Sequence, residues 1–156
     1  MCIRDSANTT WRLLDCYGKW TDGRITYPYG EHAEGQLMYN DHGSFSGQIA
    51  GSGRPVFESG NLLKGTPEEI KKAFEGYIAY YGTYEVDENN SQITHHVENG
   101  LFPNWVGNNQ TRTYEFEGKN LRLNTQPIKG AKADLTVTLL WAVSYTHLTL
   151  PTNREV

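Results

Sequence analysis

The chain has 156 residues and a formal net charge of −4, with 14 Lys and Arg against 18 Asp and Glu. This length suits one domain with a single hydrophobic core, and a mildly acidic chain without a basic cluster argues against a nucleic-acid partner. No apolar run approaches the ~18 residues that a membrane-spanning helix needs, so no membrane span is expected.

Both ends of the chain read as translated sequencing adapter. Residues 1–6, Met-Cys-Ile-Arg-Asp-Ser, can be encoded by a short DNA whose reverse complement encodes Val-Ser-Tyr-Thr-His, the sequence of residues 143–147. One inverted repeat that resembles a transposon end from library preparation accounts for both, and a chance match is the alternative. We therefore predict a domain over residues 7–142, with residues 1–6 and 143–156 as adapter-derived tails.

Cysteine usage and composition favour a β protein without disulfides. Cys2 lies in the expected tail, which leaves Cys16 alone in the domain, and a single cysteine forms neither an internal disulfide nor a metal cluster. A lone thiol fits a reducing compartment, so we expect a cytoplasmic protein; a signal peptide lost with the true N-terminus is the alternative. Sixteen Gly and ten Tyr favour strands joined by tight turns.

Short alternating segments run through the domain. Alternation of apolar and polar side chains is the two-residue period of a strand with one buried face, and the first strand is expected to place Trp11, Leu13, Asp15 and Tyr17 on one face. Gly, Asn and Asp between the segments mark turns. In chain order the predicted strands are residues 11–17, 24–27, 35–40, 44–50, 83–87, 92–98, 111–117, a strand through Leu121 and Leu123, and residues 135–141.

Residues 66–81 predict one amphipathic helix in mid-chain, after an aperiodic loop over residues 51–65. Thr66 and Glu69 match a capping box, and apolar side chains recur at three- and four-residue steps. Gly82 is expected to supply the C-terminal stop. A single helix among strands is expected to cover a mouth or a flank of the sheet.

These elements predict an all-β, mainly antiparallel protein. The natural architecture is an up-and-down β-barrel of about eight strands with one mid-chain amphipathic helix. Antiparallel closure leaves no exposed strand edge, and eight strands leave room for one small ligand.

Adjacent His95 and His96 point to opposite faces of one strand because side chains alternate. His95 falls on the apolar face with Ile93 and Val97. Two histidines on opposite faces cannot ligate one metal from a regular strand, and zinc needs three or four converging ligands. No metal and no other cofactor is therefore expected.

The segment after this strand is unusually apolar for a loop. Asn99-Gly100 is expected to end the strand, and residues 101–105 read Leu-Phe-Pro-Asn-Trp. We expect this segment to fold back over one end of the barrel and to bury Phe102 or Trp105.

Motifs spread over nearly all of residues 7–142 carry a family resemblance. They are Trp11-Arg12-Leu13, Asp22-Gly23-Arg24, Tyr27-Pro28-Tyr29-Gly30, Gly35-Gln36-Leu37-Met38-Tyr39, Ala73-Phe74, Tyr77, Tyr80-Tyr81-Gly82-Thr83-Tyr84, His95-His96-Val97, Pro103-Asn104-Trp105, Arg112, Leu121, Leu123 and Leu140-Trp141. On these residues the chain resembles the lipocalin-like domain family of bacteria and fungi, a calycin-type barrel. The resemblance implies ligand binding in a barrel lumen, without a single established substrate.

Two departures from the family pattern bear on how the barrel closes. Thr9 stands where lipocalin-type barrels usually have Gly, and Ala142 meets the expected tail where the last strand usually continues.

The candidate ligand-binding residues are Tyr84, His95, Asn104, Trp105 and Arg112. A buried guanidinium must find an anion or several acceptors, so Arg112 can clamp a ligand carboxylate or enolate beside a His95 that holds or moves a proton near neutral pH. In the structural alternative, Arg112 pairs with an internal carboxylate or stacks on a buried tryptophan, and a buried carbonyl satisfies His95.

Three functions remain open at this point. The favoured one is a non-enzymatic binder of a small, largely apolar molecule with a polar or anionic end. The second is an isomerase, cyclase or lyase in which His95 acts as acid or base and Arg112 stabilises an oxyanion. The third is a structural or interaction module with a packed lumen. The expected partner is a small hydrophobic or amphipathic ligand, and the sequence leaves the oligomeric state open.

Overall fold

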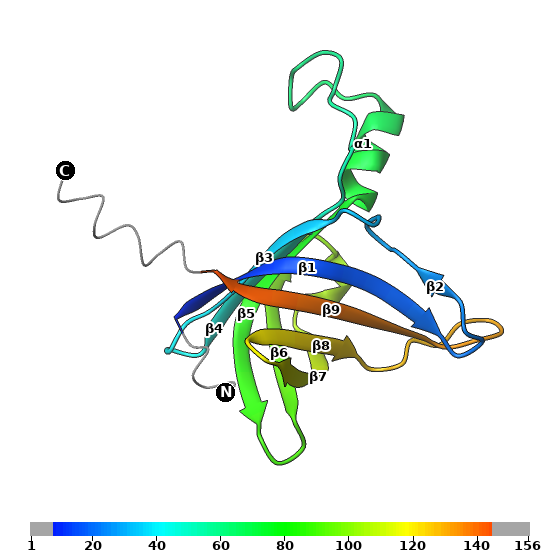
Figure 1. Ribbon diagram of the computed structural model, residues 1–156. Helices are drawn as coiled ribbons and strands as arrows, with labels where there is room; N and C mark the ends of the chain where they lie inside the picture. The colour runs from blue at the N-terminus through cyan, green and yellow to red at the C-terminus, as the bar shows by residue number, and fades with distance from the viewer. Residues whose placement is uncertain (1–7, 145–156) are drawn as a thin grey trace.

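The computed structural model describes residues 8–144 as a β-barrel with one α-helix (Figure 1). The elements in chain order are β1 (Thr9–Trp20), β2 (Ile25–Thr26), β3 (Glu34–Tyr39), β4 (Ser44–Ala50), α1 (Pro67–Glu75), β5 (Tyr77–Asp87), β6 (Gln92–Gly100), the 3-10 helix η2 (Pro103–Trp105), β7 (Asn109–Glu117), β8 (Asn120–Thr125) and β9 (Leu135–Ser144). The predicted tail over residues 1–6, and all but the first two residues of the predicted tail over residues 143–156, lie outside the described residues.

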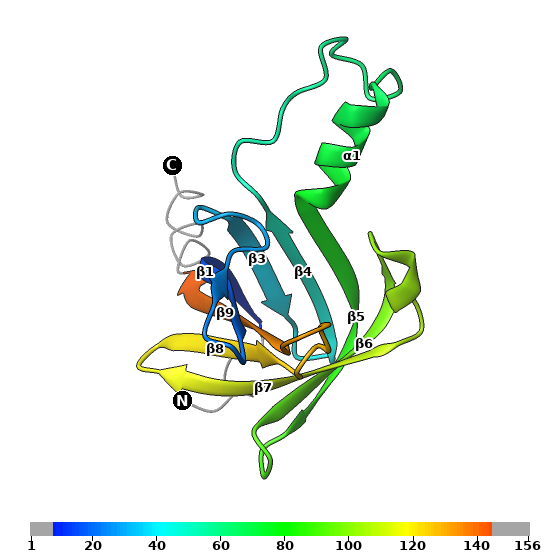
Figure 2. The ribbon, with the colours of Figure 1, turned by 90° about the vertical axis from the view of Figure 1, so that its right-hand side faces the viewer.

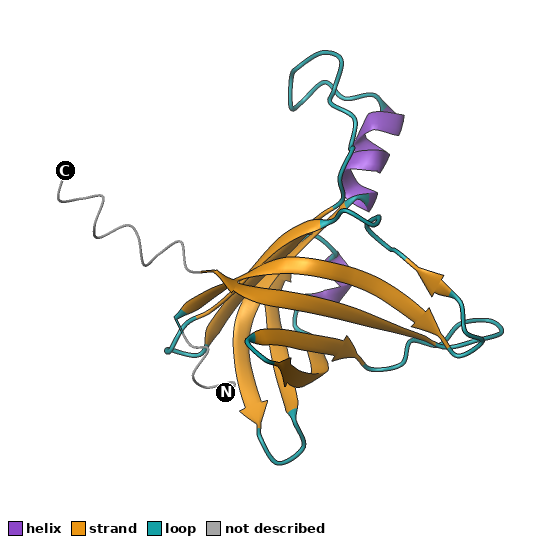
Figure 3. Cartoon of the chain, in the orientation of Figure 1, coloured by secondary structure: helices purple, strands orange, loops and turns teal. Residues whose placement is uncertain are grey.

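The sheet closes on itself (Figure 3). Its strands follow in the order β1-β3-β4-β5-β6-β7-β8-β9, and β9 pairs back with β1 from Thr10↔Ser144 to Trp20↔Leu135. All of these pairings are antiparallel, which confirms the predicted all-β barrel of eight strands. The two-residue β2 pairs with β1 alone. Val143 and Ser144, which the prediction assigned to the tail, continue β9 and complete the closing pair.

A bulge in β1 divides the four residues that the prediction placed on one face of the first strand. Leu13 pairs with Trp141 and Asp15 with Leu140, so Leu14 is an extra residue, and it is 52% exposed. Beyond the bulge the alternation is inverted, because two residues now oppose one. Cys16 therefore shares the buried face of Trp11 and Leu13, whereas Asp15 and Tyr17, which were predicted on that face, are half-buried.

The predicted helix over residues 66–81 is too long. The capping box is confirmed, since Glu69 N donates to Thr66 Oγ1 at 3.2 Å and Thr66 N donates to Glu69 Oε1 at 2.8 Å. The helix nevertheless ends at Glu75, and β5 begins at Tyr77 and pairs with β4. Aromatic and β-branched residues after position 76 fit a helical stripe and a strand equally well in the sequence, and pairing with β4 decides in favour of the strand.

The helix also does not cover the barrel as expected. Together with the loop before it, α1 stands out from one end of the barrel (Figures 1 and 2). Ile70 is 53% exposed and Phe74 is 48% exposed. Because residues 77–81 belong to β5, the apolar stripe that remains on α1 is too short to bury a useful area against the strands. Among the described residues no helix is long and apolar enough to cross a membrane.

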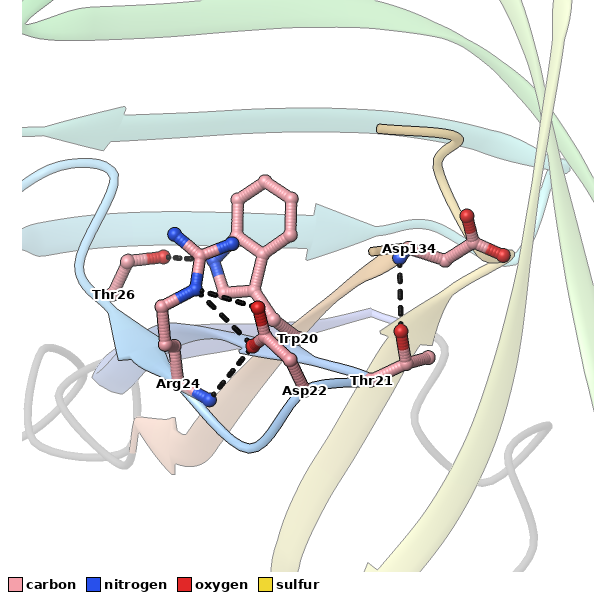
Figure 4. A network of polar contacts seen from close by, with 6 residues as sticks. All are labelled: Trp20, Thr21, Asp22, Arg24, Thr26 and Asp134. Carbon is pink, nitrogen blue, oxygen red and sulfur yellow. Dashed lines mark hydrogen bonds and ion pairs between the residues drawn. The ribbon is translucent and has the colours of Figure 1, made fainter. Parts of the chain in front are cut away.

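A polar network holds the turn between β1 and β2 (Figure 4). Arg24 Nε donates to the Asp22 carboxylate at 2.9 Å, and the guanidinium lies 4.6 Å from the centroid of the Trp20 ring. Asp134 N donates to Thr21 Oγ1 at 3.0 Å, which ties this turn to the loop before β9. The network therefore fixes the end of the barrel where β1 finishes and β9 starts.

Gly82 is a strand residue and not the predicted helix stop. Tyr81 pairs with Asn99 and Gly82 with Val97, so Glu98 is an extra residue in β6. A Cβ on Gly82 would lie 1.9 Å from the His96 carbonyl oxygen. The close approach of the two strands at this bulge thus requires glycine. The strand also runs through Gly100, past the Asn99-Gly100 end that the sequence predicted.

We expect Gly82→Ala to destabilise the protein by about 2–3 kcal/mol, because the new methyl group overlaps a backbone carbonyl that cannot move aside. Gly47→Ala in β4 is the matched control, since its Cβ would meet only Leu37 Cδ1 at 3.3 Å, the end of a side chain that can rotate. Urea unfolding of both variants measures the difference. Equal free energies of unfolding would contradict the proposed strand contact.

Candidate functional site

One end of the barrel is filled by large side chains, and a cavity of about 500 Å³ lies beside this packed end. The packed end contains Trp11, Tyr39, Phe45, Ile93 and Leu121, each at most 4% exposed. The cavity walls are mainly apolar and include Leu37, Ile49, Ile78, Leu123, Leu139 and Trp141. Cavities of this size and lining are typical of small-molecule sites.

His95 lies at the boundary between the packed end and the cavity. It is 1% exposed and lines the cavity from β6. Its Nε2 lies 2.7 Å from Tyr39 Oη, its Nδ1 lies 3.2 Å from Tyr80 Oη, and its ring stacks on Phe45 with centroids 4.2 Å apart. Two phenols, and not the buried carbonyl of the structural alternative, satisfy the imidazole.

We assign the tautomer of His95 from its two hydrogen-bond partners. A neutral imidazole has one donor and one acceptor nitrogen. Tyr39 is 2% exposed and makes its hydrogen bond to His95 Nε2, so the buried Tyr39 hydroxyl is best satisfied as the donor in that bond. His95 Nδ1 then carries the hydrogen and donates to Tyr80 Oη. This assignment leaves the Tyr80 O–H free to donate into the cavity.

His95 is a poor proton carrier at neutral pH. Burial, followed by the charges of Arg112 and His96, lowers the pKa of His95 from 6.5 to about 3. The imidazole therefore stays neutral, because no carboxylate among residues 8–144 lies close enough to stabilise its charge. Its partners are also neutral, since burial raises the pKa of Tyr39 and of Tyr80 above 10.

Arg112 reaches the cavity from β7 and is 8% exposed. Its Nη1 donates to the Thr111 carbonyl oxygen at 3.2 Å, and both terminal nitrogens lie 3.4–3.5 Å from Gln110 Oε1. The guanidinium also donates a hydrogen bond to the Tyr80 hydroxyl, and through its charge and this bond it partly offsets the effect of burial on the pKa of Tyr80. No ion pair or aromatic stacking of Arg112 occurs within residues 8–144, in contrast to the structural alternative.

The other sequence-predicted site residues are placed at different depths. Trp105, in η2, lines the cavity and packs edge-on against Tyr80 with centroids 5.2 Å apart. Tyr84 sits outside the cavity lining, where its hydroxyl donates to the Asn40 carbonyl at 2.7 Å. Asn104 is exposed and does not line the cavity, and Phe102 is 39% exposed. The structure thus brings together His95, Trp105 and Arg112.

Tyr80 and Gln110 are two polar residues of the cavity wall that the predicted set of ligand-binding residues did not contain. Tyr80 was placed on a helix, although its spacing from Gly82 and Tyr84 also fits one face of a strand. Gln110 precedes the predicted start of its strand at position 111, whereas β7 begins at Asn109.

The cavity carries one positive charge at neutral pH. Its titratable lining groups are Cys16, Tyr29, Tyr80, His95 and Arg112. Burial is the main cause that raises the pKa of both Cys16 and Tyr29 to about 12. No carboxylate lines the cavity in the described part of the chain, and no three potential metal ligands converge there. Arg112 is therefore an unneutralised cation in an apolar enclosure.

Comparison with known proteins supplies the family. Residues 9–143 match the model of the lipocalin-like domain family. The chain belongs to this family. The lipocalin-like chain is also similar to the 4'-hydroxy-3'-methoxypropiophenone carrier protein ppsC of Aspergillus oryzae (strain ATCC 42149 / RIB 40), with 34% identity over 86 residues that cover 51% of this chain and 78% of that protein. The resemblance read from the sequence is thereby confirmed.

The lowered pKa of His95 predicts how the stability of the lipocalin-like barrel depends on pH. The unfolded chain takes up a proton at this site as the pH falls below 6.5, whereas the folded chain does not until about pH 3. The stabilisation is therefore complete above pH 6.5 and is lost as the pH falls, by roughly 2 kcal/mol between pH 7 and pH 5.

Urea unfolding at several pH values measures this loss. His95→Gln should remove the loss of stability between pH 7 and pH 5 that His95 causes. His96→Gln is the control and should keep this loss, because the pKa of His96 is shifted in the opposite direction: the Asn109 hydrogen bond and then Glu85 raise it. An imidazole resonance of His95 that titrates near pH 6.5 in the folded protein would show the prediction to be wrong.

Proposed function

We propose that this lipocalin-like protein is a carrier that binds a small, largely apolar molecule in the barrel lumen and holds its anionic or hydrogen-bond-accepting end at Arg112. The observation that carries the proposal is the buried guanidinium without a carboxylate partner among residues 8–144, at the wall of a 500 Å³ apolar cavity. Such a group gains most when a ligand oxygen supplies the missing acceptor.

The similar protein from Aspergillus oryzae suggests a ligand class. It is named as a carrier of 4'-hydroxy-3'-methoxypropiophenone, a phenolic aryl ketone. A molecule of this type fits the chemistry of the cavity, because its ring suits the side chains of Trp105 and Trp141 and its oxygens suit Arg112. We propose phenolic aryl ketones as the first ligands to examine.

The same geometry favours a carrier over an enzyme. An acid–base enzyme that works near neutral pH needs a group with a pKa close to that pH, and the pKa of His95 lies at about 3. A fully packed structural module is disfavoured by the volume of the cavity.

Isothermal titration calorimetry with 4'-hydroxy-3'-methoxypropiophenone, decanoate and decanol tests the proposal. Wild-type protein should bind the propiophenone or decanoate more tightly than decanol. Arg112→Met should weaken binding of the preferred ligand about 10- to 100-fold, because one charged hydrogen-bond donor is lost. Arg12→Met is the matched control, since Arg12 is exposed on β1 and should bind like wild type.

Circular dichroism of Arg112→Met must accompany the titration. A folded variant that binds all three probes as wild type does would contradict a role for Arg112 in binding, and an unfolded variant would assign Arg112 to structure. Mass spectrometry of the recovered ligand completes the test, because chemical conversion of a probe would identify an enzyme.

A further inference from the structure

The donors at the inner wall of the cavity are arranged to receive one oxygen atom that carries negative charge. Arg112 has five N–H donors, and the oxygens that they meet are neutral: those of Gln110 and Thr111 at 3.2–3.5 Å, and the Tyr80 hydroxyl. With Tyr39 assigned as the donor to His95 Nε2, Tyr80 accepts from His95 Nδ1 and from Arg112, and its own O–H is left to donate. A charged donor and a neutral donor therefore face the same part of the cavity.

In the part of the chain that the structure describes, the cavity wall contains no carboxylate that would compete with an anionic ligand for Arg112. The titratable groups that line the cavity come from β1 (Cys16), the segment before β3 (Tyr29), β5 (Tyr80), β6 (His95) and β7 (Arg112). All except Arg112 are neutral at neutral pH. Burial raises the pKa of Cys16, Tyr29 and Tyr80, and it is the main cause that lowers the pKa of His95 to about 3. In this enclosure the Coulomb attraction between Arg112 and an anion is stronger than in water.

We propose that the lumen takes acidic phenols as their phenolates, with the ligand oxygen between the Arg112 guanidinium and the Tyr80 hydroxyl. This inference rests on the proposed carrier function and specifies which form of the ligand is carried. When the ligand binds, the phenol O–H bond breaks, the electron pair stays on the oxygen, and the proton passes to the solvent. His95 cannot take this proton because its pKa is about 3, and no carboxylate of the described chain lines the cavity.

A selection rule follows from this arrangement. A phenol with an acyl group in the para position is more acidic than a simple phenol, because the carbonyl delocalises the negative charge. The free energy needed to deprotonate such a ligand on binding is small, whereas it is large for a weakly acidic phenol or an alcohol. Affinity for the acidic phenol should therefore rise as the pH approaches the pKa of the free ligand and then level off. The bound ligand should have a lower pKa than the free ligand.

Two probes separate the phenolate from the neutral molecule. The first is 4'-hydroxy-3'-methoxypropiophenone, whose absorption band moves to longer wavelength on ionisation. The second is 3',4'-dimethoxypropiophenone, in which a methyl ether replaces the phenol and no ionisation is possible. Absorption spectra and calorimetry are recorded at one pH unit below the pKa of the free phenol, in two buffers that differ in ionisation enthalpy.

With wild-type protein the bound phenol should show the phenolate band and release about 0.9 proton per ligand. The ether should bind at least tenfold more weakly, with no dependence on pH. Arg112→Met should bind the phenol about tenfold more weakly or worse, without the phenolate band. Arg112→Lys should retain the band, because the charge is kept, and Tyr80→Phe should retain it with an affinity a few-fold lower.

The remaining outcomes separate this inference from the proposed carrier function. If the phenol binds with its neutral spectrum, or the ether binds equally well, the inference is overturned and the carrier function stands. If decanoate binds and neither propiophenone does, the ligand class is wrong and the inference falls with it. If no probe binds to the folded protein, both the inference and the carrier function fail.

Discussion

The pairing of β9 with β1 is the constraint on which the site depends. It joins the first and last strands of the described chain over ten register pairs, from Thr10↔Ser144 to Trp20↔Leu135. An open sheet would expose Arg112 and His95 to water, where a charge and an imidazole need no special partners. Closure encloses both in a low-dielectric lumen. The bulge at Leu14 contributes to the same result, because it turns Cys16 inward and keeps the Asp15 carboxylate off the cavity wall.

Enclosure has opposite consequences for the two basic residues of the lumen. His95 is neutral at neutral pH, because its pKa is lowered to about 3, and the hydroxyl groups of two tyrosines form hydrogen bonds with the neutral ring. A guanidinium cannot do the same, because arginine remains protonated in proteins. Arg112 therefore stays cationic, with the neutral oxygens of Gln110, Thr111 and Tyr80 as its acceptors. Enclosure in the lumen raises the free energy of the unpaired Arg112 cation, and it also strengthens the attraction of Arg112 for an anionic ligand. In this way the closed barrel favours the proposed function.

The sequence predicted the fold class and most strands because alternation and turn residues are local signals. The inward faces of His95, Arg112 and Leu121 followed from alternation alone and are confirmed by their burial. The two bulges could not be predicted, since an extra residue such as Leu14 or Glu98 becomes visible only when the partner strand fixes the register. For the same reason the start of β5 was taken for helix, and Tyr80 was lost from the candidate site. The exposed position of Asn104 depends on the geometry of η2, which residue spacing does not encode.

A crystal structure of the complex with a brominated 4'-hydroxy-3'-methoxypropiophenone, phased on the bromine signal, tests the central claim most directly. The account predicts the ring inside the barrel, beside Trp105 and Trp141, with the phenolic oxygen within hydrogen-bond distance of the Arg112 guanidinium and of the Tyr80 hydroxyl. A ligand bound outside the lumen, for example on the exposed Ile70 and Phe74 of α1, would contradict it. A ligand inside the lumen whose oxygens all avoid Arg112 would contradict it as well.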